Sequence, residues 1–222
     1  MKRLVSILNK RTVVRASELY RSGIHPQELS RAIQRGLLLK IGRGLYVCKD
    51  FRADFERRIV LACKRVPNGV ICLQSAVKCH GILRYDSDSI WMAIDFKAKK
   101  PIANGLKLRF VRFSGRALTQ GVVNTKIDGV PVRIYSAAKT VADCLKYRGK
   151  IGRGIAAQIL RESIAGKKCS EQRLRHFAKI CRVYRLVHVA YSSADPSVRA
   201  SRTLSEPPLG RGTLTDSVNP AQ

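Results

Sequence analysis

Four polar side chains near the N-terminus have the types and the spacing that reading the bases of DNA requires. Winding their segment as a helix, at about 100° per residue, brings them to one face. They are Gln27, Ser30, Arg31 and Gln34. In the major groove Gln pairs bidentately with adenine, Arg pairs bidentately with guanine, and Ser bonds to several bases. Glu28 points to the side of this face, so the face itself carries no carboxylate that would repel phosphate.

The opposite face of the same segment is apolar, as docking on a core requires. Its members are Leu29, Ala32, Ile33 and Gly36, with Arg35 at the flank. Pro26 suits the first helical position because its fixed φ fits a helix start, and this makes His25 the N-cap. The pattern predicts a helix over residues 26–35. An ordinary amphipathic helix with a solvated polar face would show the same pattern, and this alternative stays open.

Two short helices are predicted before this one. Residues 3–9 place apolar side chains at helical spacing, and residues 17–21 form a second helix that Gly23 ends. An extended stretch at residues 13–14 lies between them. The short turn between the second and third helices is typical of a helix-turn-helix.

A β-hairpin is predicted after the third helix. Residues 37–41 and 45–48 have strand character and meet across a loop bracketed by glycines, residues 42–44. Three helices followed by a hairpin are the plan of a winged helix-turn-helix, in which Lys40 and Arg43 of the wing would touch phosphate. The full set expected to contact DNA is Gln27, Ser30, Arg31, Gln34, Arg35, Lys40 and Arg43.

The charge of the chain points to a polyanionic partner. Lys and Arg number 43 against 15 Asp and Glu, which leaves +28. The basic residues outnumber the acidic ones by 11 to 3 over residues 1–50, by 20 to 7 over 51–150 and by 12 to 5 over 151–222. The excess therefore runs along the whole chain, which favours an extended footprint on nucleic acid. A cationic surface without a ligand remains the alternative.

Three carboxylates suggest an enzymatic alternative. Asp86 and Asp88 stand two residues apart and Asp95 follows on the next strand, a set that could hold Mg²⁺ for nucleotidyl transfer. The Gly-Ser turn that would hold the incoming phosphates is missing before them, and residues 85–89 have the composition of a loop. We expect a polar turn, no catalysis and no cofactor.

The cysteines do not have the spacing of a metal site. The seven are Cys48, Cys63, Cys72, Cys79, Cys144, Cys169 and Cys181. None forms a C-x-x-C pair. Cys72, Cys79 and His80 come nearest to a metal site, but the second closely spaced pair of ligands that zinc requires is missing. Cys63 and Cys72 stand among aliphatic residues, where Cys serves as a small core residue. With no apolar run long enough for a membrane span or an export signal, we expect reduced thiols in a cytoplasmic protein.

The fold class predicted is α+β, with an N-terminal winged helix-turn-helix over residues 1–50 and a mixed α+β domain over 52–190. In the second domain helices are predicted at residues 53–64, 70–80, 137–147, 154–165 and 171–184, and strands at 90–96, 106–113, 122–127 and 130–135. Residues 191–222 are rich in Ser, Pro, Gly and Arg, and a disordered tail is expected there.

Several motifs resemble the AbiEi family of antitoxins. In the first domain they are Val13-Val14, Glu18-Leu19, Ser22-Gly23-Ile24, residues 29–35 and residues 36–46. In the second they are Ile127-Asp128-Gly129-Val130-Pro131-Val132-Arg133-Ile134-Tyr135 and Ala138-Lys139-Thr140-Val141-Ala142-Asp143. These two motifs of the second domain are similar to two strands and the helix that follows them in that family. In that helix a basic residue, Thr and Asp recur. Together the motifs cover roughly residues 1–185.

The resemblance implies an antitoxin of a type IV toxin-antitoxin pair. Such a protein represses its own operon by binding inverted repeats in the promoter, and it opposes a nucleotidyltransferase-like toxin without forming a stable complex with it. Two other hypotheses stay open. One is an orphan winged-helix regulator without a toxin partner, and the other is a transcription factor that senses a small molecule in the second domain.

Overall fold

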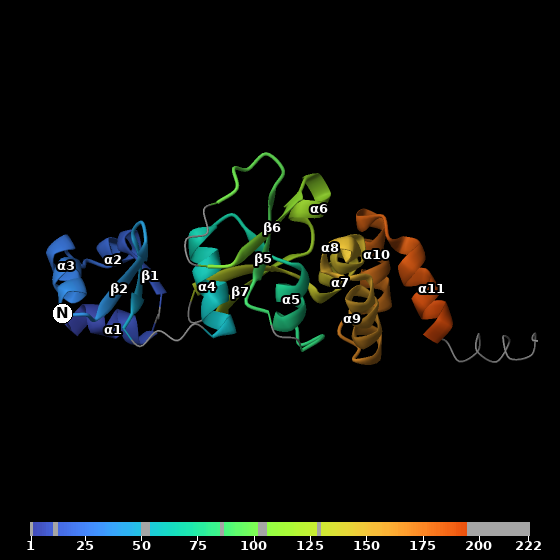
Figure 1. Cartoon of the computed structure of the whole chain (residues 1–222), viewed down its shortest axis with the longest axis horizontal. Helices are drawn as coiled ribbons and strands as arrows, with labels where there is room; N and C mark the ends of the chain where they lie inside the picture. Colours follow the sequence, from blue (N-terminus) through green and yellow to red (C-terminus); the bar gives the residue numbers. More distant parts are fainter. Residues whose placement is uncertain are drawn as a thin grey trace, which may run out of the picture.

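The fold is known from a computed structural model, which describes residues 2–10, 13–49, 54–84, 87–101, 106–127 and 130–194. Its elements fall into an N-terminal unit and a larger unit of helices packed on a sheet (Figure 1). The expected tail, residues 191–222, falls mostly outside the described residues, although the last helix continues to Ala194.

The N-terminal unit is a winged helix-turn-helix, as the sequence predicts. Its elements are α1 (Lys2–Lys10), β1 (Val13–Arg15), α2 (Ala16–Arg21), α3 (Pro26–Gln34), β2 (Leu38–Gly42) and β3 (Leu45–Cys48). The strands form an antiparallel sheet in the order β1-β3-β2. Because β2 includes Gly42, the turn of the wing consists of Arg43 and Gly44 alone, and Gly44 takes a φ of +62° that favours glycine.

Helix α3 begins and ends with local signals. The Nδ1 atom of His25 accepts the backbone N–H of Gln27 at 3.5 Å, and Pro26 follows as the first helical residue. At the other end Gly36 has a φ of +69°, and the N–H of Leu37 donates to the carbonyl of Ala32 at 3.0 Å. This is a Schellman ending, which requires the left-handed residue and stops the helix one residue before the predicted end.

The larger unit contains a five-stranded mixed sheet in the order β6-β5-β4-β8-β7. Its strands are β4 (Val70–Ile71), β5 (Ile90–Asp95), β6 (Leu108–Phe113), β7 (Val122–Ile127) and β8 (Val130–Tyr135). Its helices are α4 (Phe55–Arg65), α5 (Leu73–Cys79), α6 (Gly115–Thr119), α7 (Ala137–Lys146), α8 (Arg148–Ile151), α9 (Arg153–Ala165), α10 (Glu171–Cys181) and α11 (Tyr184–Ala194). No helix within the described ranges is long and apolar enough to cross a membrane.

The structure corrects the prediction of one continuous helix over residues 70–80. Val70 and Ile71 form β4, the central strand, which pairs antiparallel with β5 and parallel with β8. Only the residues from Leu73 onward are helical. A two-residue strand buried on both sides has no alternating pattern, so periodicity could not separate it from the apolar helix that follows. Three elements were not predicted, namely the short helices α6 and α8 and the terminal helix α11.

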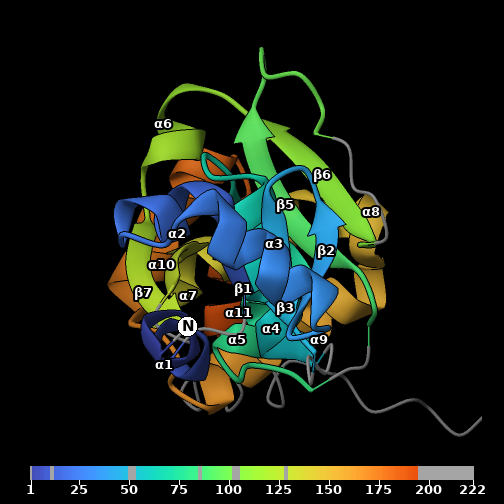
Figure 2. The same cartoon turned by 90° about the vertical axis from the view of Figure 1, so that its left-hand side faces the viewer.

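The sheet of the larger unit is covered on both faces. Helix α4 lies on the face toward the N-terminal unit, and α7, α9 and α10 lie on the other side (Figures 1 and 2). On the α7 side Trp91, Ala93 and Val111 join the core, and on the α4 side Ile90 and Met92 do so. Side chains that alternate along β5 therefore enter two cores.

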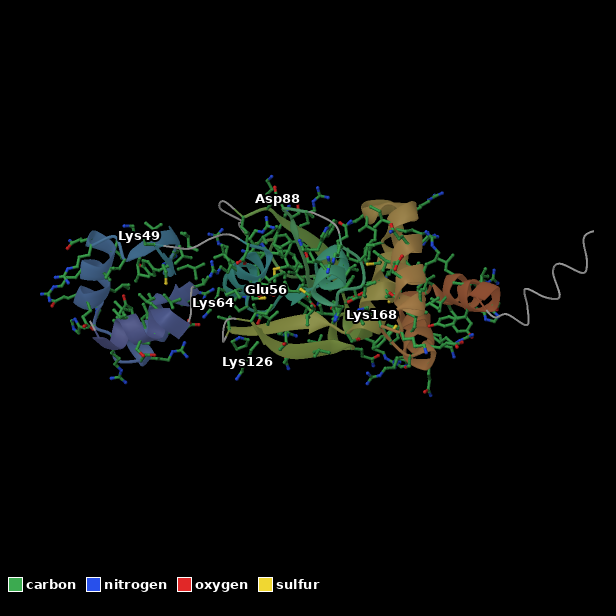
Figure 3. All side chains as sticks on the ribbon, turned by 90° about the horizontal axis from the view of Figure 1, so that it is seen from below. Lys49, Glu56, Lys64, Asp88, Lys126 and Lys168 are labelled. Carbon is green, nitrogen blue, oxygen red and sulfur yellow. The ribbon has the colours of Figure 1, made fainter. Side chains whose placement is uncertain are left out.

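Helix α4 also packs against the N-terminal unit. Val13, Leu45 and Val47 from the small sheet belong to the same apolar cluster as Ile59 and Val60 of α4. Lys64, labelled between the two units in Figure 3, forms an ion pair with Glu18 of α2. The guanidinium of Arg15 donates to the backbone carbonyl of Lys64. The two units are thus packed against each other through side chains from both.

A fully buried ion pair lies inside helix α7. The Nζ atom of Lys139 is 2.6 and 2.5 Å from the two carboxylate oxygens of Asp143, and the side chains are 0 % and 1 % exposed. Lys139 also lies 4.4 Å from the ring centroid of Tyr135, and the thiol of Cys181 donates to Asp143 at 3.1 Å. Burial raises the pKa of Asp143, against the opposing effect of Lys139. The sequence pattern of α7 thus places a charged pair in the core.

Removing one member of this pair should destabilise the fold strongly. We expect Asp143→Leu to lower the free energy of unfolding by about 3–5 kcal/mol, because Lys139 is left buried without its counter-ion. The double variant Lys139→Met, Asp143→Leu should recover most of this loss. Urea denaturation followed by circular dichroism measures both. As a control, Glu171→Leu breaks the exposed Glu171–Arg175 pair of α10 and should cost at most about 1 kcal/mol. A double variant no more stable than Asp143→Leu would contradict the account.

Candidate nucleic-acid interface

Helix α3 lies at the end of the molecule farthest from the larger unit (Figure 1). Viewed from that end, α3 is in front, with nothing of the described chain covering its outer side (Figure 2). Its inner side packs on the small core of the N-terminal unit, in which Leu29 is 3 % and Ala32 0 % exposed. The position of the helix thus leaves one face free to approach a DNA groove.

The free face holds the side chains that the sequence singled out for base reading. Gln27, Ser30, Arg31 and Gln34 are all exposed. Glu28 is half-buried at the side of this face. The geometry required for insertion into a major groove is therefore present, and the contact of each side chain with a base stays a prediction.

The cations expected to touch phosphate lie around this face. Arg35 is exposed at the end of α3, Lys40 is exposed on β2, and Arg43 is exposed in the turn of the wing. The structure adds Arg3 of α1, an exposed residue whose guanidinium lies against the turn at Gly23 between α2 and α3. Twenty residues separate Arg3 from Gly23, so no local pattern could have revealed that contact.

The wing is fastened to the larger unit. The Nη2 atom of Arg65, at the end of α4, donates to the carbonyl of Ile41 at 2.6 Å. The added Cβ of any residue at position 42 would lie 3.2 Å from the same Nη2 atom, so Gly42 permits this close approach. The backbone that bears the wing cations is therefore fixed by two contacts, the pairing of β2 with β3 and the hydrogen bond from Arg65 of α4.

The two described carboxylates of the enzymatic alternative, Asp88 and Asp95, do not form one site. Asp88 lies just before β5 and pairs with Arg58 at 2.9 Å and Lys107 at 3.4 Å, contacts that hold the pKa of its carboxyl below the ordinary value. Asp95 lies at the other end of β5 and accepts the N–H of Lys97 at 2.8 Å. A strand of this length separates them by about 20 Å, too far for one Mg²⁺. Asp86 lies outside the described residues.

Cys63 and Cys72 behave as core residues, as the sequence predicts. Cys72 is fully buried, Cys63 packs against the α4 cluster, and burial raises the pKa of the Cys63 thiol to about 12. Among the described residues no group of three His, Cys, Asp or Glu side chains is arranged to hold a metal ion. Nothing in this arrangement activates a thiolate at neutral pH.

A winged helix-turn-helix with an exposed, polar third helix and a cationic wing defines a DNA-binding transcriptional regulator. Residues 2–48 match the family model described as "Transcriptional regulator, AbiEi antitoxin". The N-terminal unit is therefore similar to the corresponding part of that family, which confirms the resemblance for this part of the chain. The motifs over residues 127–143 lie outside the matched segment.

Among solved structures, the crystal structure of the RV2827C protein from Mycobacterium tuberculosis is similar, with a TM-score of 0.54 and 16 % sequence identity. The alignment covers 80 % of this chain and 70 % of that one, so the likeness extends into the larger unit. At this identity it shows the fold alone. No curated protein matches the chain.

Substitutions on α3 and on the wing should have different effects on DNA binding. Arg31→Ala and Gln34→Ala should each weaken specific binding by about 1–3 kcal/mol, because a base contact is lost. Arg43→Ala should lower affinity for all sequences and reduce the salt slope by about one, because a phosphate contact is lost. Gel-shift titrations on operator and random duplexes at several salt concentrations measure both effects.

Lys168, exposed in the larger unit and far from α3 in Figure 3, provides the control for these substitutions. Lys168→Ala should leave both affinities nearly unchanged. Equal, steeply salt-dependent affinity of the wild-type protein for operator and random DNA would mean that α3 reads no sequence.

Proposed function

We propose that this chain is the antitoxin of a type IV toxin-antitoxin pair and the repressor of its own operon. The observation that carries the proposal is the exposed polar face of α3 within a domain that matches AbiEi antitoxin regulators. Its DNA ligand would be inverted repeats in its own promoter, read through Gln27, Ser30, Arg31, Gln34, Arg35, Lys40 and Arg43. Repression of an operon implies a cytoplasmic location.

The proposal divides the work between the two units. Residues 1–50 would read DNA, and residues 52–190 would oppose a nucleotidyltransferase-like toxin without forming a stable complex with it. The motif Lys139-Thr140-Val141-Ala142-Asp143 supports this second role through its similarity to the family, and its buried ion pair makes it a structural element of that domain. In this proposal the chain has no catalytic role of its own.

A regulator that senses a small molecule is the second candidate, because the larger unit has a suitable hollow. It measures about 770 Å³, within the usual range for ligand sites, and lies between α4, α5 and the strands β7 and β8. Phe55 and Ile59 of α4 line it. A ligand there would touch the helix that carries the DNA-binding domain. A nucleotidyltransferase-like reading frame beside the gene favours the antitoxin, and its absence favours the regulator.

Repression and toxin antagonism should be separable in the intact chain. In cells that carry the adjacent toxin gene under a separate promoter, the double variant Arg31→Ala, Gln34→Ala should lose repression of an operon reporter. It should still restore growth, because the larger unit is unchanged. Reporter activity and growth, with antitoxin levels matched by immunoblot, measure the two functions, and Lys168→Ala is the control.

Two results would contradict this division. If the double variant also fails to restore growth at equal protein level, antagonism requires DNA reading and the two units do not work separately. If the wild-type chain fails to restore growth, the antitoxin proposal is wrong and the regulator candidate gains.

A further inference from the structure

A second cationic surface lies at the edge of the large sheet, away from the DNA-reading helix. It is a hollow of about 570 Å³ beside the edge strand β6, here named the β6-edge patch. Four of its lining side chains are cations, Lys100, Arg109, Arg112 and Lys150. None of its described lining residues is acidic. The patch therefore attracts an anion along its whole length.

Aromatic rings lie among these cations. Phe110 and Tyr147 line the hollow and are half-buried, so part of each ring is accessible. Lys150 lies 5.7 Å from the ring centroid of Tyr147, and Arg109 lies 5.4 Å from that of Trp91, which is only 5 % exposed at the bottom. The phenol of Tyr147, whose pKa burial raises to about 12, is neutral at physiological pH and does not repel phosphate.

Charge alone at a sheet edge has a simpler explanation, since cations on edge strands prevent pairing between molecules. The opposite edge of the same sheet provides the comparison (Figure 2). There β7 presents Thr125 and Lys126, and the hollow beside it combines two carboxylates, Asp54 and Glu56, with Lys78, whose Nζ atom lies 4.5 Å from the ring centroid of Phe55. A cation over a ring thus occurs beside both edges, and the β6 edge differs in that four cations gather there with no acidic residue among the described lining residues.

We propose that the β6-edge patch binds single-stranded RNA. Phosphates would be held by Lys100, Arg109 and Lys150, for which no described carboxylate lies within ion-pair distance. Unpaired bases would stack on Phe110 and Tyr147, a combination of cations and rings typical of single-strand binding. A duplex keeps its base faces covered, so the strand bound here must be unpaired, and unpaired loops and ends are the parts of RNA that proteins usually recognise.

Arg112 has a different role in the patch. Its Nη1 atom donates to the carbonyls of Phe96 and, at 2.9 Å, Ala98. It therefore fixes the loop that follows β5, and the adjacent Phe96 is 65 % exposed at that loop. Replacement of Arg112 would disturb this loop and so would not report on phosphate binding alone.

The single tryptophan of the chain makes the site directly observable. Trp91 lines the patch, and the N-terminal unit contains no tryptophan, so quenching of Trp91 fluorescence reports binding at the patch. Titrating the full-length protein with a uridine 12-mer should quench Trp91 saturably. A 12-base-pair DNA duplex should bind α3 and leave Trp91 unquenched, and a thymidine 12-mer should bind no tighter than the uridine strand.

Two independent variants test the groups that the proposal names. Arg109→Glu with Lys150→Glu should weaken binding of the uridine 12-mer at least about tenfold, and Phe110→Leu should weaken it about fivefold or more, through loss of phosphate contacts and of stacking respectively. Lys126→Glu with Lys168→Glu changes the net charge equally at exposed positions elsewhere and should have less than about a threefold effect. Thermal melting confirms that each variant is folded, and fluorescence anisotropy of a labelled strand gives the affinity.

Four results would overturn the proposal. They are absence of saturable quenching, equal quenching by the duplex, tighter binding of the thymidine strand, and an equal loss of affinity in the control double variant. Aggregation of the Arg109→Glu, Lys150→Glu protein with unchanged affinity for RNA would assign the patch to edge protection instead.

Discussion

Helix α4 bears apolar side chains on two sides, and the rest of the structure depends on both sides being covered. One side packs on the large sheet and the other on the small sheet of the DNA-binding unit, so that Ile59 and Val60 are fully buried. A helix that is apolar on both sides is unstable with either partner alone. The ion pair between Lys64 and Glu18 then fixes how the two units face each other. Glu18 also accepts the backbone N–H of Arg15 and so caps the start of α2. The same carboxylate therefore contacts both the helix-turn-helix and α4 of the larger unit.

The parts of the fold that local rules determine were predictable from the sequence. Pro26 and Gly36 set the limits of α3, and the alternation of apolar and polar residues between them set its two faces. The hairpin of the wing follows from Gly44, and the hairpin of β7 and β8 was predicted with the same bounds as observed. In each case the residues that decide the structure lie within one turn of the element that they define.

The parts that depend on distant contacts were not predictable. Val70 and Ile71 are a strand because β5 and β8 pair with them, and neither partner is adjacent in sequence. Glu18 and Lys64 are 46 residues apart, and each looks like an ordinary surface residue in its own helix. The β6-edge patch combines Trp91 with Lys150 through the folded sheet and α8. Its cations were counted in the sequence as excess charge, but their grouping around aromatic rings was not visible there.

The distribution of charge limits what DNA reading by α3 can explain. Residues 51–150 have 20 basic and 7 acidic side chains, a larger excess than the 11 and 3 of the first fifty. At physiological salt an exposed charge acts over about 8 Å, so cations on the far parts of the larger unit attract little to a duplex seated on α3. Because α4 holds the two units in one arrangement, those cations cannot reach the same groove by a loose linker. DNA reading by α3 therefore leaves this excess unexplained. The proposed contact of RNA with the β6-edge patch, where rings and cations coincide, would account for part of it.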